Sequence, residues 1–393
     1  MADNYFEQTL NYVNLLKMKY GLVYSHDFSR FSYGKTHPFN LARGEKFYQY
    51  LEKNQLLSDP DIELIQPRQI PEELLLVAHH PLYLKSLKDA DTGEFKMEML
   101  QFGLGSEDCP VFPGVYQYSR LSAGASFEAF NRVVNKELNF VFNPVGGFHH
   151  AKRSFAEGFC YVNDVNLIAH LILLQGYKVA YLDFDAHHGN GVQDEFYSNQ
   201  NLLFVSFHEN GKYLYPGTGF ENEIGKGAGV GYNVNLPLDP ATDDEIFLYL
   251  YWELVPPLLD AFKPDFGIVL FGADPLNQDP LTHLRLTNNA LAEVALDLNT
   301  RFKYWIGLGA GGYNLEATAR TWALLWSVIT AQENEAEMAT LGGVFLGGSE
   351  LGASSFRDLR SFSSGPEKER ASTEAKRVAR YIQREIFPLV GAK

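Results

Sequence analysis

The chain has 393 residues, 46% of them hydrophobic and 14% aromatic, so it can bury a large core. Its formal net charge of −15 argues against nucleic-acid binding through a basic face, and suits either a cationic partner or solubility alone. The longest apolar runs, 266–271 and 167–174, are far shorter than the roughly 20 residues of a membrane span, and the N-terminus lacks a signal-peptide pattern. Two cysteines are too few for a disulfide framework. We therefore expect a cytoplasmic protein that binds neither membranes nor nucleic acid directly.

Short apolar segments alternate with amphipathic segments along the chain. Strands are expected at 138–142, 179–184, 202–207, 266–271 and 304–308. Helices are expected at 161–175, 243–262, 287–301 and 315–330, the last two capped by Thr287 and Asn314. Since the strands are apolar on both faces and the crossovers are long, the sequence predicts an α/β fold with one open parallel sheet between helices.

No internal repeat or low-complexity block divides the chain. The most linker-like segment is the serine-rich stretch 352–365, which precedes a charged helix at about 366–386. We expect a single domain over residues 1–393, with its core at about 20–330 and the last helix closing it.

Polar residues or glycines follow each of the expected strands. The strand ends are NPVGGFHHA, DFDAHHGNG, VSFHENG, FGADPLNQDP and GLGAGGYN. Because ligands of parallel α/β sheets bind beyond the carboxyl ends of the strands, we expect these five ends to meet in one crevice.

The second of these ends carries two carboxylates and two imidazoles. Side chains of an extended segment alternate, so Asp183, Asp185 and His187 face one side and His188 the other. Crowded carboxylates at a buried strand end are costly unless a cation compensates, and Asp and His suit Zn²⁺ or another divalent first-row ion. The expected ligands are Asp185, His187 and, from the GAD motif, Asp274. The simpler alternative is a hydrogen-bonded acidic turn with incidental histidines.

A second histidine pair, His149 and His150, follows two glycines at another strand end. We interpret a consecutive pair there as a general acid and base, with Asp183 and Asn190 as orienting partners. Tyr313, in the glycine-rich GAGGYN, offers an O–H group that could polarise a carbonyl, although ordinary packing is the commoner role of such a tyrosine.

In this order the motifs resemble the histone deacetylase family, including its bacterial acetoin-utilisation-type members. The likeness runs from about residue 20 to about residue 326, and its motifs are THPFNLAR, EDCPVFPG, GGFHHAKRSFAEGFCYVND, YLDFDAHHGNGVQDEFY, VSFHENGKYLYPGTG, GADPLNQDPLTHLRLT and LGAGGYNLEATARTW. The resemblance implies the arginase/deacetylase fold. Arginases hold two metals and would show DAHxD, whereas Gly189 and Gly272 indicate a single catalytic metal here.

The resemblance also implies a role for each part of the site. A catalytic zinc ion would bind the three expected ligands. His150 would activate the water and protonate the leaving amine, His149 would stabilise charge beside it, and Tyr313 would donate to the carbonyl oxygen. The implied substrate-binding residues are Gly158, Phe159, Tyr215 and Leu281 in the tunnel wall and Asp108 at the rim. One K⁺ or Na⁺ ion is implied near Asp183, Asp185, His187, Ser206 and Phe207, and another near Phe196, Asn199, Leu202 and Tyr232.

Three positions depart from the usual family pattern, and one of them is Phe148, which replaces a frequent tryptophan. Asn190 stands where many eukaryotic members carry Asp, so we expect a lower proton affinity for His150 than a carboxylate partner would give. Tyr215 replaces the usual phenylalanine of the tunnel wall and adds a hydroxyl group.

The expected function is the zinc-dependent hydrolysis of the acetyl amide of N-ε-acetyl-lysine in proteins or peptides. One alternative keeps this chemistry but changes the substrate to a small acylated amine such as an acetylpolyamine. An acidic gatekeeper at the tunnel mouth would favour that alternative, whereas Leu281 is apolar. Another is a non-catalytic member that binds acyl-lysine or metal, against which the complete set of catalytic residue types weighs.

Overall fold

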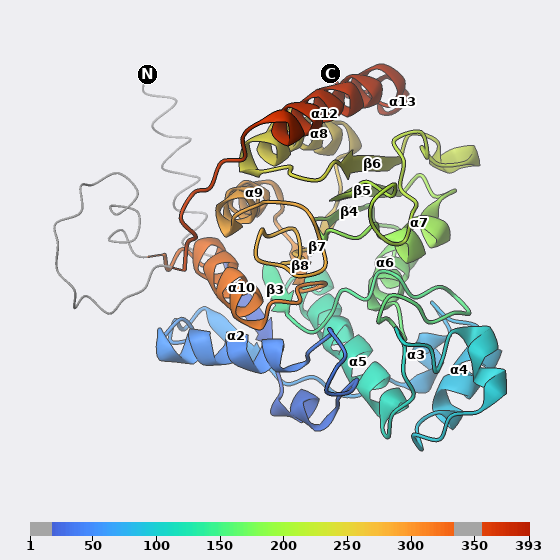
Figure 1. Cartoon of the computed structure of the whole chain (residues 1–393). Coiled ribbons are helices and arrows are strands. Elements are labelled where there is room, and N and C mark those ends of the chain that lie inside the picture. The colour runs from blue at the N-terminus through green and yellow to red at the C-terminus, as the bar shows by residue number, and fades with distance from the viewer. Residues whose placement is uncertain (1–17, 334–355) are drawn as a thin grey trace.

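The centre of the molecule is an eight-stranded sheet. A computed structural model describes residues 18–333 and 356–393. The strand order is β2-β1-β3-β8-β7-β4-β5-β6, and every neighbouring pair is parallel (Figure 1). The strands are β1 (Tyr20–Val23), β2 (Ile62–Ile65), β3 (Phe140–Asn143), β4 (Val179–Asp183), β5 (Leu202–Glu209), β6 (Asn233–Leu238), β7 (Phe266–Leu270) and β8 (Trp305–Leu308). The predicted α/β class with an open parallel sheet is confirmed.

Three strands, β1, β2 and β6, have no counterpart in the sequence prediction. The first two have only four residues each, and β2, at one edge of the sheet, is mostly half-exposed and lacks a continuous apolar run. At the other edge, β6 contains two asparagines and Pro237. A proline is tolerated there because an edge strand has one side without ladder hydrogen bonds. Short length and, for β2 and β6, the edge position therefore explain why the sequence pattern did not predict these strands.

Helices connect the strands. They are α2 (Ala42–Lys53), α3 (Glu72–Leu75), α4 (Pro81–Asp89), α5 (Val115–Val134), α6 (Asp164–Leu174), α7 (Asn190–Phe196), α8 (Asp244–Phe262), α9 (Asn288–Arg301), α10 (Leu315–Ile329), α12 (Pro366–Glu385) and α13 (Phe387–Val390). The predicted caps are confirmed, since Thr287 and Asn314 each accept a backbone N–H from the first turn of their helix. Among the described residues, no helix is both long and apolar enough to cross a bilayer.

One predicted helix begins later than expected, and the last predicted helix lies where it was expected. The helix predicted at 161–175 begins later, at Asp164, because the side chain of Asn163 accepts the N–H of Asn166 at 2.8 Å and caps α6. The last predicted helix corresponds to α12, which packs against α8 and β6. Of the serine-rich segment before it, residues 352–355 lie outside the described residues.

Helices cover both faces of the sheet. One layer holds α2, α8, α9, α10 and α12, and the other holds α5, α6 and α7 (Figure 1). Side chains of β4 alternate between them, because Ala180 and Leu182 belong to the apolar cluster of the first layer and Val179 and Tyr181 to that of the second. This arrangement explains why the strands are apolar throughout.

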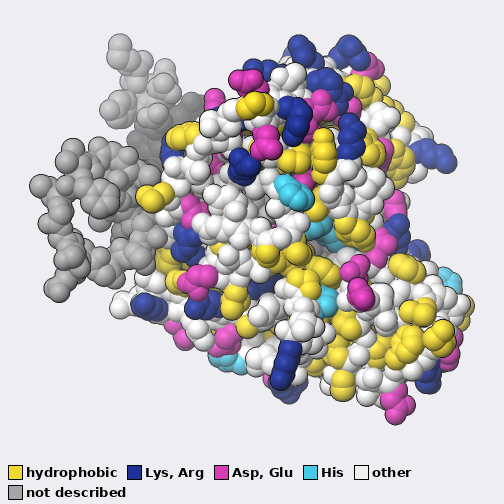
Figure 2. Space-filling model, in the orientation of Figure 1, with side chains coloured by type: hydrophobic (Ala, Val, Ile, Leu, Met, Phe, Trp, Pro, Cys, Tyr) yellow, Lys and Arg dark blue, Asp and Glu magenta, His cyan; other side chains and the backbone are white. Residues whose placement is uncertain are grey.

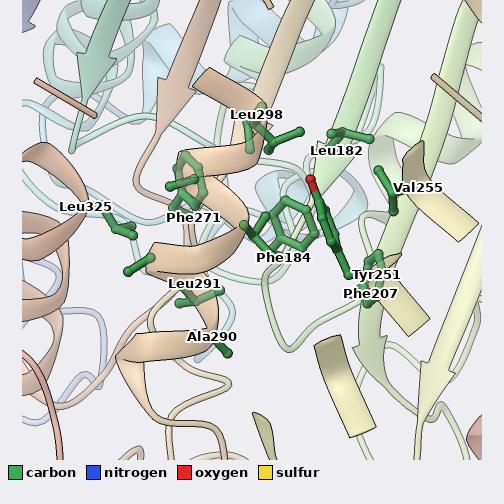
Figure 3. Packing of buried hydrophobic residues seen from close by; sticks show 14 of the residues in the cluster. Leu182, Phe184, Phe207, Tyr251, Val255, Phe271, Ala290, Leu291, Leu298 and Leu325 are labelled. Atoms are coloured by element: carbon green, nitrogen blue, oxygen red, sulfur yellow. The ribbon is translucent and has the colours of Figure 1, made fainter. Parts of the chain in front are cut away.

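An aromatic cluster anchors the chain where β4 ends. The ring of Phe184 lies 5.3 Å from that of Phe207 and 6.2 Å from that of Phe271, and Tyr251 of α8 packs beside them (Figure 3). Because Phe184 points into this core, its neighbours Asp183 and Asp185 face the other side of the chain.

The carboxyl ends of β3, β8, β7 and β4 lie side by side. The register pairs Asn143 with Leu308, Leu308 with Leu270, and Leu270 with Asp183. The loops that follow these strands therefore start at one edge of the sheet, although they are far apart in the sequence. The two histidine pairs, the GAD motif and GAGGYN meet there.

Candidate active site

Three buried side chains that can bind a metal meet beyond β4 and β7. Nδ1 of His187 lies 3.1 Å from Oδ1 of Asp185 and 2.8 Å from Oδ2 of Asp274. One potential ligand atom from each of the three residues lies within 4.8 Å of the other two. The structure thus brings together the three ligands expected from the sequence.

Glycine and backbone donors shape the space around these carboxylates. The N–H of Ala186 donates to Asp274 at 2.9 Å, and the N–H of Gly311 donates to Asp185 at 2.6 Å. A Cβ atom at Gly311 would lie only 2.3 Å from Oδ2 of Asp274 and 2.5 Å from Oδ2 of Asp185. Any larger residue at 311 would therefore displace both carboxylates.

The donor set fits a divalent cation. Two carboxylates and one imidazole are ligands that zinc takes in catalytic sites, where a further position stays open. Burial and the charge of Asp185 raise the pKa of Asp274 to about 8 when no cation lies between them. A cation would relieve this crowding of two buried carboxylates. The residues present therefore fit zinc.

A buried carboxylate holds His149. Oδ2 of Asp183 accepts hydrogen bonds from the hydroxyl of Tyr181 at 2.6 Å and from Nδ1 of His149 at 2.8 Å. Burial by itself lowers the pKa of His149, but the charges of Asp183 and Asp185 outweigh it and raise the pKa. His149 is therefore suited to carry positive charge.

His150 lies in a different electrostatic environment. Its Nδ1 lies 2.8 Å from Oδ1 of Asn190, and its Nε2 lies 3.1 Å from Nε2 of His149. Burial, followed by the charges of His149 and His187, lowers the pKa of His150 well below its usual range. The hydrogen bond to Asn190 acts in the opposite direction and is outweighed. The expected difference from a carboxylate partner stays a prediction. His150 is therefore neutral at pH 7, as a general base must be.

Tyr313 lies near the metal-binding group as a protonated phenol. Its ring is 6.1 Å from that of His187 and 5.7 Å from that of Phe159. Its backbone N–H donates to Asp279 at 2.7 Å, which fixes the loop after β8. Burial and the charge of Asp274 raise the pKa of Tyr313 well above its usual value, so that its O–H remains a donor.

Several of these groups line the same cavity. It is lined by His149, His150, Asp185 and Tyr313, and also by Phe39 and Arg43. The guanidinium of Arg43 lies 4.2 Å from the ring centre of Phe39, and its positive charge partly offsets the carboxylates. Histidine atoms are visible among hydrophobic side chains near the middle of this face of the molecule (Figure 2).

Two predicted tunnel residues form a turn against His150. Gly158 and Phe159 both have positive φ angles, 54° and 67°. A Cβ atom at Gly158 would lie 2.3 Å from Cδ2 of His150, so only glycine allows this close approach. Tyr215 also lies beside His150, with 5.3 Å between the ring centres, and is 43% exposed. An aromatic ring thus lies between His150 and solvent.

The other two predicted substrate residues lie further out. Asp108 is exposed, and its backbone carbonyl lies 3.2 Å from Nε2 of His37. Leu281 is half-buried, and its N–H donates at 2.9 Å to Asp279, the carboxylate that also holds Tyr313. The role of these residues as a substrate tunnel and rim stays a prediction.

Comparison with known proteins decides the family. The sequence matches the model of the histone deacetylase domain over residues 37–329. The chain belongs to the histone deacetylase family. The acetoin utilization protein AcuC of Bacillus subtilis is 37% identical over 313 residues, which cover 77% of this chain and 80% of AcuC. Histone deacetylase 1 of Homo sapiens is 33% identical over 302 residues, which cover 76% of this chain and 62% of that protein.

Solved structures of histone deacetylase homologues share the fold. An HDAC homolog from Aquifex aeolicus has a TM-score of 0.79 and 28% sequence identity, covering 93% of this chain and 100% of its own. An HDAC homolog complexed with SAHA gives the same TM-score and identity, covering 92% of this chain and 100% of its own. The protein is thus a deacetylase of this family with a buried Asp-His-Asp metal site.

The residues expected to bind monovalent cations fall in two places. In the first, Ser206 lies opposite Asp183 in the register of β5 and β4. In the second, the carbonyl of Phe196 accepts the N–H of Asn199 at 2.9 Å, and the carbonyl of Tyr232 accepts an N–H of β5 at 2.8 Å. Binding of K⁺ or Na⁺ at either place stays a prediction.

Three acidic residues near the site have no role in the sequence prediction. Glu157 accepts a hydrogen bond from the amide of Asn190 at 2.7 Å. Asp279 accepts the backbone N–H groups of both Tyr313 and Leu281. Glu209 is fully buried and accepts from the backbone N–H and the ring of His283 at 2.8 and 2.7 Å. Each follows or lies within a recognised motif, but its partner is far away in the sequence, so spacing alone gives no signal.

Proposed function

We propose that this protein hydrolyses the acetyl amide of N-ε-acetyl-lysine in proteins or peptides, releasing acetate and a free lysine amine. The position of His187 carries the proposal, because its ring lies 5.9 Å from that of His150 and 6.1 Å from that of Tyr313. A carbonyl carbon at the metal site would thus have a proton acceptor and an O–H donor within reach. The net charge of −15 also supports a lysine-rich, cationic substrate.

His150 is the group placed to move protons. A zinc ion on Asp185, His187 and Asp274 would supply positive charge that polarises the amide carbonyl and activates water. Nε2 of His150, neutral because of burial, takes a proton from the attacking water as the C–O bond forms. It then donates that proton to the amine nitrogen as the C–N bond breaks. His149, paired with Asp183, stabilises the negative charge that develops nearby.

Tyr313 and the aromatic wall complete the proposed mechanism. The phenol O–H of Tyr313 donates to the carbonyl oxygen as it becomes an oxyanion. Phe159, Tyr215 and Leu281 would line a narrow approach that fits the four-methylene stem of lysine and excludes water. Asp108, exposed at the rim, would accept N–H groups of the peptide backbone.

The proposal includes three accessory features. K⁺ or Na⁺ beside Asp183 and Ser206 would reduce the repulsion between neighbouring carboxylates, and a second such ion would bind near Asn199.

The chain would form one domain closed by α12. Cys109 and Cys160 are buried free thiols, which supports function in the reducing cytoplasm.

The alternative substrate is a small acylated amine such as an acetylpolyamine. An acetylpolyamine carries a second, positively charged amine, and this charge needs an acidic side chain as its partner. Glu209, the buried carboxylate on this side, is already hydrogen-bonded to His283, and Leu281 is apolar. These contacts favour a peptide.

A substrate comparison tests the proposal. Acetyl-lysine peptides and acetylpolyamines are offered to the zinc-loaded protein, with and without a metal chelator. We expect turnover of the peptides that the chelator abolishes. Activity on polyamines alone would favour the alternative substrate, and hydrolysis that resists the chelator would contradict the metal mechanism. Zinc binding without turnover of either substrate would support a non-catalytic member.

The oxyanion donor gives a sharper test within the peptide assay. We expect Tyr313→Phe to lower kcat by about 10²- to 10³-fold, because one O–H donor to the oxyanion is lost while the ring remains. Tyr249→Phe on α8, far from the metal group in the sequence and half-buried, is the matched control and should keep full activity. Zinc content is measured in both variants. Turnover by Tyr313→Phe at the wild-type rate would exclude this role for Tyr313.

A further inference from the structure

A chain of hydrogen bonds leads from His150 to a carboxylate near the surface. Nδ1 of His150 lies 2.8 Å from Oδ1 of Asn190, and Nδ2 of Asn190 donates to Oε1 of Glu157 at 2.7 Å. The side chain of Glu157 is 20% exposed, and the ammonium of Lys152 lies 3.7 Å away. The neutral amide of Asn190 is thus held between an imidazole and a carboxylate.

The carboxylate determines which way the amide points. The two ends of an asparagine amide have almost the same shape, but one end only accepts hydrogen bonds and the other only donates. An ionised carboxylate only accepts. The NH₂ end of Asn190 must therefore face Glu157, which leaves the carbonyl end for His150. Without Glu157, the amide could turn over.

The amide orientation in turn selects the tautomer of His150. A carbonyl oxygen next to Nδ1 requires that Nδ1 carry the hydrogen, so the lone pair of the neutral ring lies on Nε2. That atom lies 3.1 Å from Nε2 of His149, which can donate to it. If the amide turned over, Nε2 of His150 would carry the hydrogen and could not accept a proton from water.

We propose that Glu157 is a positioning residue for His150, acting through the amide of Asn190 to hold the tautomer that has its lone pair on Nε2. The catalytic consequence rests on the proposed function, whereas the tautomer is a property of the folded chain. A direct Asp at position 190 would need no such support, since both of its oxygens accept. The pair Glu157 and Asn190 therefore replaces a single carboxylate with a carboxylate and an oriented amide.

A purely structural role for Glu157 predicts a different effect. Glu157 begins the turn that carries Gly158 and Phe159, and its carbonyl accepts the N–H of Cys160 at 3.0 Å. If the side chain only supported this turn, its loss would move Phe159 and raise KM. If it sets the tautomer of His150, its loss lowers kcat and leaves KM nearly unchanged.

Exchanging the two groups separates these roles. Glu157→Gln leaves an amide that can present either end to Asn190, and Asn190→Asp places two carboxylates against each other. The double variant E157Q/N190D restores one amide and one carboxylate, with an acceptor facing His150. We expect Glu157→Gln to lower kcat about 10- to 100-fold. The double variant should recover to within about threefold of the wild type, because a carboxylate at position 190 accepts from His150 whichever way it lies. Asp194→Asn, whose carboxylate lies 3.2 Å from Lys152, is the matched control and should keep the wild-type kcat.

Nitrogen-15 NMR of the histidine rings reads the tautomer without turnover. The signal of His150, identified by its loss in His150→Gln, should show hydrogen on Nδ1 in the wild type and in E157Q/N190D, and a mixture of tautomers in Glu157→Gln. An unchanged tautomer in Glu157→Gln would overturn the proposal, as would a double variant no more active than Glu157→Gln. Because this measurement needs no substrate, it decides the proposal even if the protein fails to deacetylate acetyl-lysine.

Discussion

His79 shows how a single buried group links pH to stability. Its side chain is fully buried, and its Nε2 accepts at 2.9 Å the backbone N–H of Asn163, the residue that caps α6. Burial lowers its pKa from 6.5 to about 4. The unfolded chain therefore binds a proton more readily than the folded one below pH 6.5. The stability that depends on neutral His79 is complete above pH 6.5 and is lost as the pH falls toward 4.

This difference predicts the pH dependence of a variant. His79→Gln keeps an oxygen that can accept from Asn163 but cannot be protonated. Between pH 7.5 and pH 5.0, we expect the unfolding free energy of the wild type to fall by about 2 kcal/mol more than that of the variant. Urea denaturation of both proteins at the two pH values measures this difference. Equal losses would show that His79 does not remain neutral in the folded state.

At the scale of elements, the start of α10 lies next to the site. Asn314 follows Tyr313 directly, and its Oδ1 accepts the N–H of Ala317 at 3.1 Å. Its Nδ2 donates to the carbonyl of Gln278 at 3.1 Å, in the loop that follows Asp274. Asn314 thus caps α10 and also links the loop after β8 to the loop after β7.

Replacing this cap should destabilise the protein by a modest amount. We expect Asn314→Ala to lower the unfolding free energy by about 1 kcal/mol, because a helix N–H loses its acceptor. Asn314→Ser keeps a capping oxygen and should recover most of that loss, although it lacks the second hydrogen bond to Gln278. Thermal or urea unfolding measures both variants. If the two variants were equally unstable, the contact with Gln278, rather than the cap, would be the important one.

At the scale of the whole molecule, the metal site joins segments that are distant in the sequence. Asp185 follows β4 and Asp274 follows β7, and only the folded sheet brings their carboxylates around His187. An ion that binds the folded chain but not the unfolded chain stabilises the fold by mass action. Burial and the charge of Asp185 raise the pKa of Asp274 to about 8. A bound ion would relieve this crowding of two buried carboxylates.

Zinc removal should therefore lower the stability of the whole protein. With free zinc at 100 times its dissociation constant, we expect the unfolding free energy to rise by about 2.7 kcal/mol over the chelated protein. Asp274→Ala should lose most of this gain. Calorimetry with zinc and with chelator measures it in both proteins. An equal melting temperature of the wild type under both conditions would mean that the three residues do not hold the ion.

Much of the fold and the site could be predicted because the signals are local. The alternation that places Asp183, Asp185 and His187 on one side spans five residues, and Thr287 and Asn314 cap helices that begin at the next residue. The three missed strands had weaker local signals, since they are short or lie at the edges of the sheet. The contact between Glu157 and Asn190 has no local signal, because a loop and α7 must first pack together.

The sequence by itself determined the apolar strands, the helix caps and the polar strand ends that carry Asp, His and Tyr, because a few neighbouring residues decide backbone geometry and side-chain direction. Only the tertiary structure decided that β8 lies between β3 and β7, which brings Tyr313 and Asp274 to the histidine pairs. It also decided how far burial lowers the pKa of His150. Strand order and burial depend on the packing of both helix layers against the sheet, and that packing sums contacts from the whole chain.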